Sequence, residues 1–173
     1  MPFKSRQRGI SLIEVLVALL IFSVGLIGLA GLMVMAMRAN QAAYQRTQVT
    51  FLADGMADRM RANALGVWRG RYNGKDYPVP GTTNCERAAC TSASLAMHDR
   101  QVWSSLLTAF LPDPAAAISC TTASSYIPTA DQLTRRPPYG GHCAMTISWS
   151  ERDAGDASHR DTARQTFAWE FQP

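Results

Sequence analysis

The hydrophobic and polar positions divide the chain into one continuous apolar stretch and a longer part with mixed patterning. From Ile10 to Met37 the only charged residue is Glu14. A helix over this stretch would be about 42 Å long, which exceeds the roughly 30 Å hydrocarbon core of a bilayer. The pattern therefore predicts a helix that can span a membrane. Because a carboxylate is costly in lipid, Glu14 is a candidate functional residue with a partner.

Apolar residues at helical spacing continue this helix beyond Met37. They form one stripe at three- and four-residue intervals: Val49, Leu52, Met56 and Met60. No proline interrupts residues 38–63, so the spacing predicts one helix from about residue 10 to about residue 62, near 80 Å in length. Its first half is apolar all round. Its second half is amphipathic and offers a stripe on which a globular domain can pack.

Three glycines lie close together in the apolar half of this helix: Gly25, Gly28 and Gly31. Each costs roughly 1 kcal/mol relative to Ala in a helix interior. Two interpretations stay open. Either the segment loosens, or admits close neighbouring helices, when subunits pack together, or Gly is simply frequent in membrane helices.

A second helix is predicted from Ser92 to Phe110, where apolar residues again recur at helical spacing. Thr91 or Ser92 can cap its N-terminus, and Pro112 ends it. The apolar face consists of six residues: Leu95, Val102, Trp103, Leu106, Leu107 and Phe110.

Alternating apolar and polar residues predict strands over 143–150 and 166–171, and a short strand is expected over 117–121. The polar link 151–161 makes the last two strands a hairpin with a long loop. Their aromatic face is expected to lie on the long helix. The fold class is therefore α+β, with a long N-terminal helix, transmembrane in its first half, packed on a small C-terminal domain with an antiparallel β-sheet.

Residues 64–90 are expected to form a loop, because glycines and prolines break any long period there. Three aromatic residues alternate with three cations in this stretch: Trp68, Tyr72 and Tyr77 with Arg69, Arg71 and Lys75. Such a pattern can stack on single-stranded nucleic acid. We favour the alternative that the aromatic side chains cover the long helix, because the stretch is short and the rest of the chain is not basic.

Positive charge precedes the apolar stretch. Lys4, Arg6 and Arg8 stand among the first nine residues, where there is no acid. This bias holds an N-terminus on the cytoplasmic side of a membrane. A secretory signal peptide has a shorter apolar region and a small-residue cleavage site, and a plain membrane anchor leaves Glu14 unexplained.

The sequence GISLIEV at residues 9–15, between the basic segment and the apolar run, resembles the class III leader of type IV prepilins and pseudopilins. The resemblance implies that a prepilin peptidase cleaves between Gly9 and Ile10 and N-methylates Ile10. It assigns docking and assembly to Glu14. Ile10 departs slightly from the pattern, since Phe is commoner at that position.

The leader motif and the patterning together divide the chain into four segments. These are a basic leader at 1–9, the transmembrane half of the helix at 10–37, its amphipathic half at 38–63 and a periplasmic globular domain at 64–173. The formal net charge is +4, and loss of three leader cations leaves about +1. The basic balance therefore gives no indication of nucleic acid as a partner.

All four cysteines follow the apolar stretch, and translocation would place them in an oxidising compartment where disulfides persist. Four cysteines allow three pairings. We favour Cys85 with Cys90, a small loop before the second helix, and Cys120 with Cys143, which joins two β segments. The competing interpretation is a metal site formed by His142, Cys143 and Cys120. The spacing between the first two cysteines, Cys-x4-Cys, is not that of a typical zinc site.

Later blocks, within residues 90–103, 118–120 and 146–151, resemble the PilV family of minor pilins. The resemblance implies a low-abundance subunit that joins other minor pilins at the filament tip and primes assembly of the major pilin. Its implied partners are the prepilin peptidase, the other minor pilins, the major pilin, the inner-membrane assembly platform and the inner membrane. Nucleic acid is not expected as a partner. Its implied location is the inner membrane, crossed once, and then the pilus at the cell surface.

No catalytic constellation is evident, and neither an enzymatic activity nor a cofactor is expected. The three histidines are scattered, without a Ser or Cys in a recognisable motif: His98, His142 and His159. Two other functions remain open. One is a minor pseudopilin of a type II secretion system, which shares the leader and the helix. The other is a DNA-binding pilin that uses the basic loop.

Overall fold

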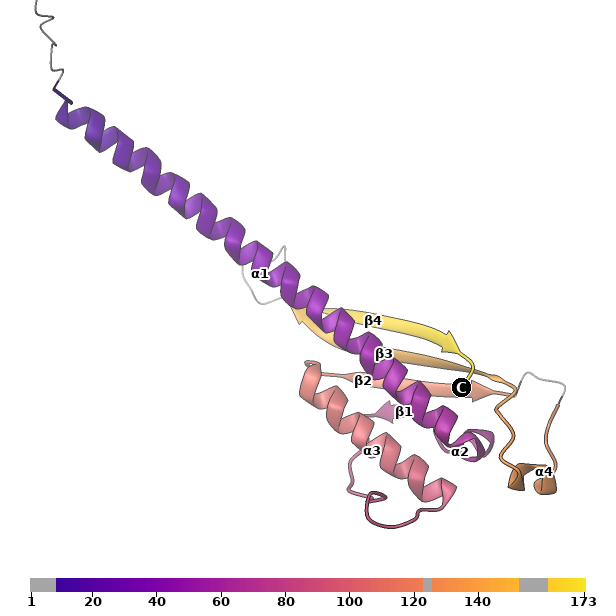
Figure 1. Cartoon of the computed structure of the whole chain (residues 1–173). Coiled ribbons are helices and arrows are strands. Elements are labelled where there is room, and N and C mark those ends of the chain that lie inside the picture. The colour runs from indigo at the N-terminus through magenta and orange to yellow at the C-terminus, as the bar shows by residue number, and fades with distance from the viewer. Residues whose placement is uncertain (1–8, 123–125, 153–161) are drawn as a thin grey trace, which may run out of the picture. The chain divides into compact units, whose positions relative to one another are not determined.

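The computed structural model describes residues 9–122, 126–152 and 162–173. The chain forms two compact units, Met1–Gln41 and Ala42–Pro173. Helix α1 contributes to both units, and the second unit also contains a β-sheet and the remaining helices (Figure 1).

Helix α1 runs from Leu12 to Ala62 without a break. Its bounds agree with the helix predicted from the apolar run and the stripe that follows it. The four residues of that stripe are all buried, as are Ala53 and Ala57 between them. The amphipathic half of α1 therefore supplies one side of the core of the second unit.

Four antiparallel strands form one sheet in the order β1-β2-β3-β4. Their bounds are Gly74–Tyr77 (β1), Ala115–Thr121 (β2), His142–Arg152 (β3) and Thr162–Phe171 (β4). This confirms the predicted fold class, a long helix packed on a small domain with an antiparallel sheet. The β3–β4 pairing is regular over its whole length, whereas the β1–β2 pairing contains an irregularity.

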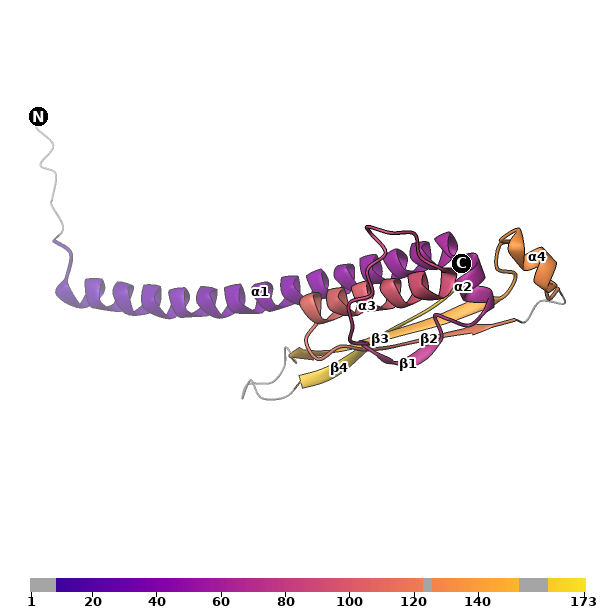
Figure 2. The ribbon, with the colours of Figure 1, turned by 90° about the horizontal axis from the view of Figure 1, so that it is seen from below.

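Helix α3, Ser92–Phe110, has the predicted bounds, and the Thr91 side chain accepts a hydrogen bond from the Ser94 N–H at its N-terminus. Within the second unit, α3 and the last turns of α1 cover the same face of the sheet (Figure 2). The Trp103 indole N–H joins them by donating to the Leu52 carbonyl at 2.8 Å. The domain is thus two layers, helices on one side and sheet on the other.

The expectation of a plain loop over residues 64–90 was wrong in part. This stretch contains the short helix α2, Ala64–Trp68, and strand β1. A further short helix, α4, spans Ala130–Thr134 between β2 and β3. These elements are four or five residues long. Side-chain caps at Asn63 and Thr129 stabilise the two short helices, and pairing with β2 stabilises β1. Such contacts leave no hydrophobic period in the sequence, so patterning does not predict these elements.

The inward face of β3 has the alternating pattern that the sequence predicts. Its buried residues are Cys143, Met145, Ile147 and Trp149. On β4, Phe171 is buried while Phe167 and Trp169 are only partly buried against the core. The sheet therefore packs fully under the helices at β3 and less completely at β4.

A buried polar cluster joins the end of α1 to α3. Asp99 on α3 accepts hydrogen bonds from Arg59 at 3.1 Å and from the Tyr72 hydroxyl at 2.6 Å. The Asn63 amide donates to the same hydroxyl at 3.0 Å and to the Ser92 carbonyl at 2.9 Å. Burial, and secondarily the neighbouring Asp99, raises the pKa of Tyr72 far above its usual value. Because every member has a partner, the cluster fixes how α1, α2 and α3 fit together.

Tyr77 lies beside this cluster at the end of β1. Its hydroxyl donates to the Tyr72 carbonyl at 2.8 Å, and its ring packs edge-on against Trp103. Burial raises the pKa of Tyr77 to about 12, although the nearby Arg100 opposes the increase.

The raised tyrosine pKa values predict a loss of stability in alkali. The contribution of Tyr77 to the free energy of unfolding should be constant below about pH 10 and fall as the pH rises from 10 towards 12. Over that range the unfolded tyrosines ionise while folded Tyr77 stays protonated up to about 12. We expect Tyr77→Phe to reduce this slope by up to about 1.4 kcal/mol per pH unit. Urea unfolding of the full chain in detergent, followed by tryptophan fluorescence, measures it. Equal slopes for parent and variant would contradict the assignment.

Candidate functional site

The motif at the start of α1 lies at the surface of its unit. Gly9 and Ile10 precede the helix, and the Ile10 side chain is 76% exposed. The Ser11 carbonyl accepts the N–H groups of Glu14 at 3.0 Å and Val15 at 3.4 Å, which begins the helix. The leader cations lie outside the described residues. The peptide bond between residues 9 and 10 therefore lies in exposed, non-helical chain just before the first helical turn.

Glu14 stands in the first turn of α1. A carboxylate is favoured there, because the first N–H groups of a helix have no intrahelical acceptor and carry partial positive charge. Its side chain borders a shallow hollow on the helix surface that is otherwise apolar: Ile10, Val15, Ala18, Leu19 and Phe22. An exposed acid on an apolar surface can bind a cation that another molecule brings to it.

The first half of α1 exposes apolar side chains on every side. All residues from 10 to 37 are exposed, and the most apolar window has a mean hydropathy of 2.7 with none of it buried. Among the described residues, α1 is the helix long and apolar enough to cross a membrane. A buried core helix or a signal sequence passes the same composition test, so the motif before the helix decides the interpretation. Helix and motif together fit membrane anchoring.

The three glycines of this half pack against no other part of the described chain. A Cβ built at Gly25, Gly28 or Gly31 meets no atom within 4 Å beyond its chain neighbours and the adjacent backbone of α1. Nothing in the chain itself therefore requires glycine at these positions, and both interpretations of them stay open.

The structure brings the four cysteines together in two pairs. Cys85 and Cys90 close a small loop between β1 and α3. Cys120 and Cys143 stand directly opposite each other on β2 and β3, with their Cα atoms 4.0 Å apart. Since both sulfurs of the second pair are bonded to each other, they are not available as thiolate ligands. The proposed metal site with His142 is therefore not supported.

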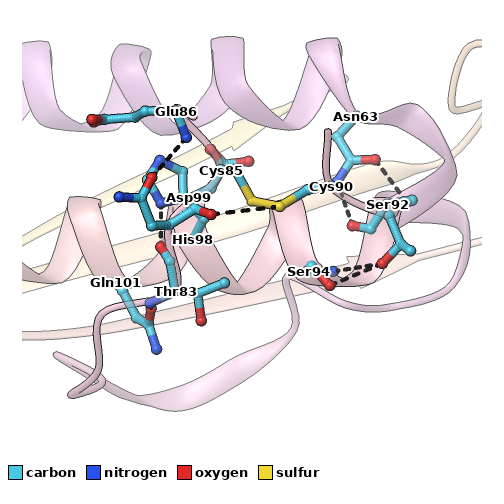
Figure 3. Close-up of a disulfide and its surroundings, with 12 residues drawn as sticks. Asn63, Thr83, Cys85, Glu86, Cys90, Ser92, Ser94, His98, Asp99 and Gln101 are labelled. Atoms are coloured by element: carbon cyan, nitrogen blue, oxygen red, sulfur yellow. Dashed lines mark hydrogen bonds between the residues drawn. A yellow bond between two sulfur atoms is a disulfide. The ribbon is translucent and has the colours of Figure 1, made fainter. Parts of the chain in front are cut away.

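Hydrogen bonds hold the segment before the first disulfide on α3 (Figure 3). The Thr83 N–H donates to the Gln101 side chain at 2.6 Å, and the Thr83 carbonyl lies 2.6 Å from a ring nitrogen of His98. His98 thus has a structural partner. His142 is exposed at the start of β3, and His159 lies outside the described residues.

The aromatic residues after α1 are covered by the fold. Tyr72 and Tyr77 are buried, and Trp68 packs edge-on against Tyr139 while its N–H donates to the Pro137 carbonyl. The rings of Tyr72 and Tyr77 are therefore not available to stack on bases, and Trp68 is half-buried. The three cations of the same stretch are exposed, but without the rings they resemble an ordinary charged surface.

Sequence reasoning did not single out the buried charge at Asp99. A signal for it exists, because Asp99 lies on the apolar face of α3, four residues after Leu95 and four before Trp103. A charged residue in such a position predicts a buried partner. Only the tertiary structure identifies that partner as Arg59, which comes from a distant helix.

Two family models match consecutive parts of the chain. The prokaryotic N-terminal methylation motif matches residues 4–30, and the family described as type IV pilin Tt1218 matches residues 31–101. No curated protein and no solved structure matches the chain significantly. The matched segments contain the leader motif, all of α1 and the first half of α3. With the fold, they support a type IV pilin with a prepilin leader.

The disulfides predict unequal contributions to stability. Replacing both Cys120 and Cys143 by Ala should lower the free energy of unfolding by about 3 to 4 kcal/mol, because that bridge closes the longer loop. The matched control, Ala at both Cys85 and Cys90, should lose about 2 kcal/mol. Denaturant unfolding of the full chain in detergent measures both. Peptide mapping without reduction checks the pairing, and any other pairing would contradict the assignment.

Proposed function

We propose that this chain is a minor pilin of a type IV pilus, related to the PilV family, that primes pilus assembly within the complex at the filament tip. The observation that carries the proposal is the methylation motif directly before an apolar helix that the chain itself leaves uncovered. Such a helix must be covered by lipid or by other helices. A pilin uses both in turn, first as a membrane anchor and then as part of a filament.

In this proposal the precursor crosses the inner membrane once, with residues 1–9 in the cytoplasm and residues 64–173 in the periplasm. Residues 10–37 span the membrane, and residues 38–63 carry the helix into the globular domain. Prepilin peptidase cleaves after Gly9 and methylates Ile10. The exposed, non-helical backbone at this bond supports the assignment, because a protease needs an accessible and unfolded peptide.

Glu14 then takes part in assembly. Extraction from the membrane into a filament, with the assembly platform, the major pilin and other minor pilins, replaces lipid around the apolar helix by protein. There Glu14 pairs with the methylated amine of an adjacent subunit. At a separation of 4 Å and an effective dielectric constant of about 20, the attraction is about 4 kcal/mol. Desolvation of both charges offsets part of it, so the pair favours correct register more than raw stability.

Glu14→Ala tests this role. We expect normal cleavage and methylation at Ile10, verified by mass spectrometry of the mature N-terminus, and at least a tenfold decrease of the subunit in sheared surface fibres. Glu14→Gln is the matched control for side-chain size, and it should lose incorporation as well if charge is what matters. Incorporation of Glu14→Ala at parent levels, with intact processing, would exclude the ion pair as a requirement.

The alternative within filament systems is a minor pseudopilin of a type II secretion system, which uses the same leader and helix. Deleting the gene and scoring twitching, protein secretion and transformation separately discriminates the two, and a minor pilin predicts loss of twitching with secretion intact. Loss of secretion alone would support the pseudopilin. The burial of Tyr72 and Tyr77 does not favour a DNA-binding pilin, for which transformation would be the function lost.

A further inference from the structure

Strand β4 is an edge of the sheet. It pairs with β3 on one side, and no other described strand pairs with it on the other (Figure 1). It runs without irregularity from Thr162 to Phe171. A long edge strand presents a row of backbone donors and acceptors on which another strand can form.

Two hydrogen bonds show which residues of β4 carry this free row. The Cys120 N–H points away from β3 and donates to the Asn73 side chain at 3.0 Å, while the Ser150 N–H points to the β2 side and donates to the Pro112 carbonyl at 3.0 Å. Even-numbered residues of β3 thus bond towards β2, and odd-numbered ones towards β4. Since the register pairs Cys143 with Phe171, the outward groups on β4 belong to its even-numbered residues, including Thr166, Ala168 and Glu170.

Two of the usual protections of an edge, proline and a bulge, are missing from β4. It contains no Pro and shows no bulge in its pairing with β3. Its two charges are Arg164, which pairs with Asp113, and Glu170 near its end. By contrast, the opposite edge β1 is four residues long and irregular. Natural sheets shorten, charge or bend their exposed edges to prevent pairing with other chains. Strand β4 is neither short nor bent, so its edge is able to pair with a further strand.

The core is incompletely covered beside the same edge. Phe167 and Trp169 point to the helix side of the sheet and remain partly exposed, and Trp169 stacks on Phe171 with ring centroids 4.6 Å apart. A strand added beside β4 would bring side chains against these rings at alternate positions. Both the backbone and the inner face of β4 are therefore suited to one further strand.

The topology fixes the direction of that strand. Because four strands alternate in direction, β4 and β1 run antiparallel to each other. If a neighbour of the same architecture stands beside this chain with its helices pointing the same way, its β1-type edge runs antiparallel to β4. The two sheets then continue into each other with both helix layers on one side. Pairing β4 with a second β4 in the antiparallel sense would reverse the helices, which subunits anchored in one membrane cannot do.

We propose that β4 pairs, antiparallel, with the first strand of a neighbouring pilin-type subunit that is not a second copy of this chain. The inference rests on the proposed function, that pilin-type subunits assemble side by side. A second copy would offer only the short, irregular β1. The partner strand carries apolar side chains facing Phe167 and Trp169. It also carries a basic side chain near Glu170, which is exposed and has no ion pair among the described residues, whereas Arg164 is engaged by Asp113.

Ala168→Pro tests the pairing in the full chain, expressed in its own bacterium with the other pilin subunits. Proline removes an N–H that points away from β3, so the β3–β4 ladder and the fold are kept. Ala168→Ser changes the same exposed side chain and keeps the N–H. After crosslinking in cells, mass spectrometry quantifies each pilin-type subunit isolated with the chain. We expect the serine variant to match the parent and the proline variant to lose one pilin-type subunit at least tenfold.

Amide hydrogen exchange of the isolated complex adds a readout specific to backbone pairing. The amides of Thr166, Ala168 and Glu170 should exchange at least tenfold more slowly in the complex than in the chain alone.

Three outcomes would overturn the proposal: unchanged exchange, equal co-isolation of the proline variant, or crosslinking of two differently tagged copies as the main product. If the parent chain itself isolates with no pilin-type subunit, the proposed function fails, and this inference fails with it. Unfolding of the proline variant would show in its circular dichroism, and the exchange result on the parent then decides.

Discussion

The constraint on which the rest depends is apolar surface that this chain cannot bury by itself. One helix, α1, carries both a half that is apolar all round and a half that packs on a sheet. The first half exposes large aliphatic side chains along its whole length, which water does not tolerate on such a scale. Lipid and neighbouring helices are the two environments that satisfy it. The one acid of this half, Glu14, stands in its first turn.

The second half of α1 shows how the same helix is joined to a folded domain. Its apolar stripe lies in the core, and two directional contacts define its position beside α3: the hydrogen bond from Trp103 to the Leu52 carbonyl, and the ion pair of Arg59 with Asp99. Apolar packing alone is non-directional. Buried polar groups, each with a partner, restrict the arrangement because any other leaves a donor or acceptor unpaired.

The two edge strands of the sheet, β1 and β4, differ in length and regularity. One edge is short and irregular, whereas the other is long, regular and flanked by incompletely covered aromatic rings. Because the number of antiparallel strands is even, the two edge strands run in opposite directions. The β4 edge of one subunit can therefore pair antiparallel with the first-strand edge of a neighbour in the same orientation. Under the proposed function, anchoring in one membrane would give neighbouring subunits this common orientation.

The long helix, the bounds of α3 and the buried face of β3 follow from local patterning, because each rests on a period that repeats over many residues. The sequence by itself also determined the leader motif, where a few residue types at fixed positions before an apolar run carry the information. Only the tertiary structure decided that Asp99 pairs with Arg59, that the rings of Tyr72 and Tyr77 are buried and that short segments such as α2 and β1 exist. It also decided that β4 is an edge. These features depend on contacts between residues far apart in the chain, and local periodicity contains no record of them.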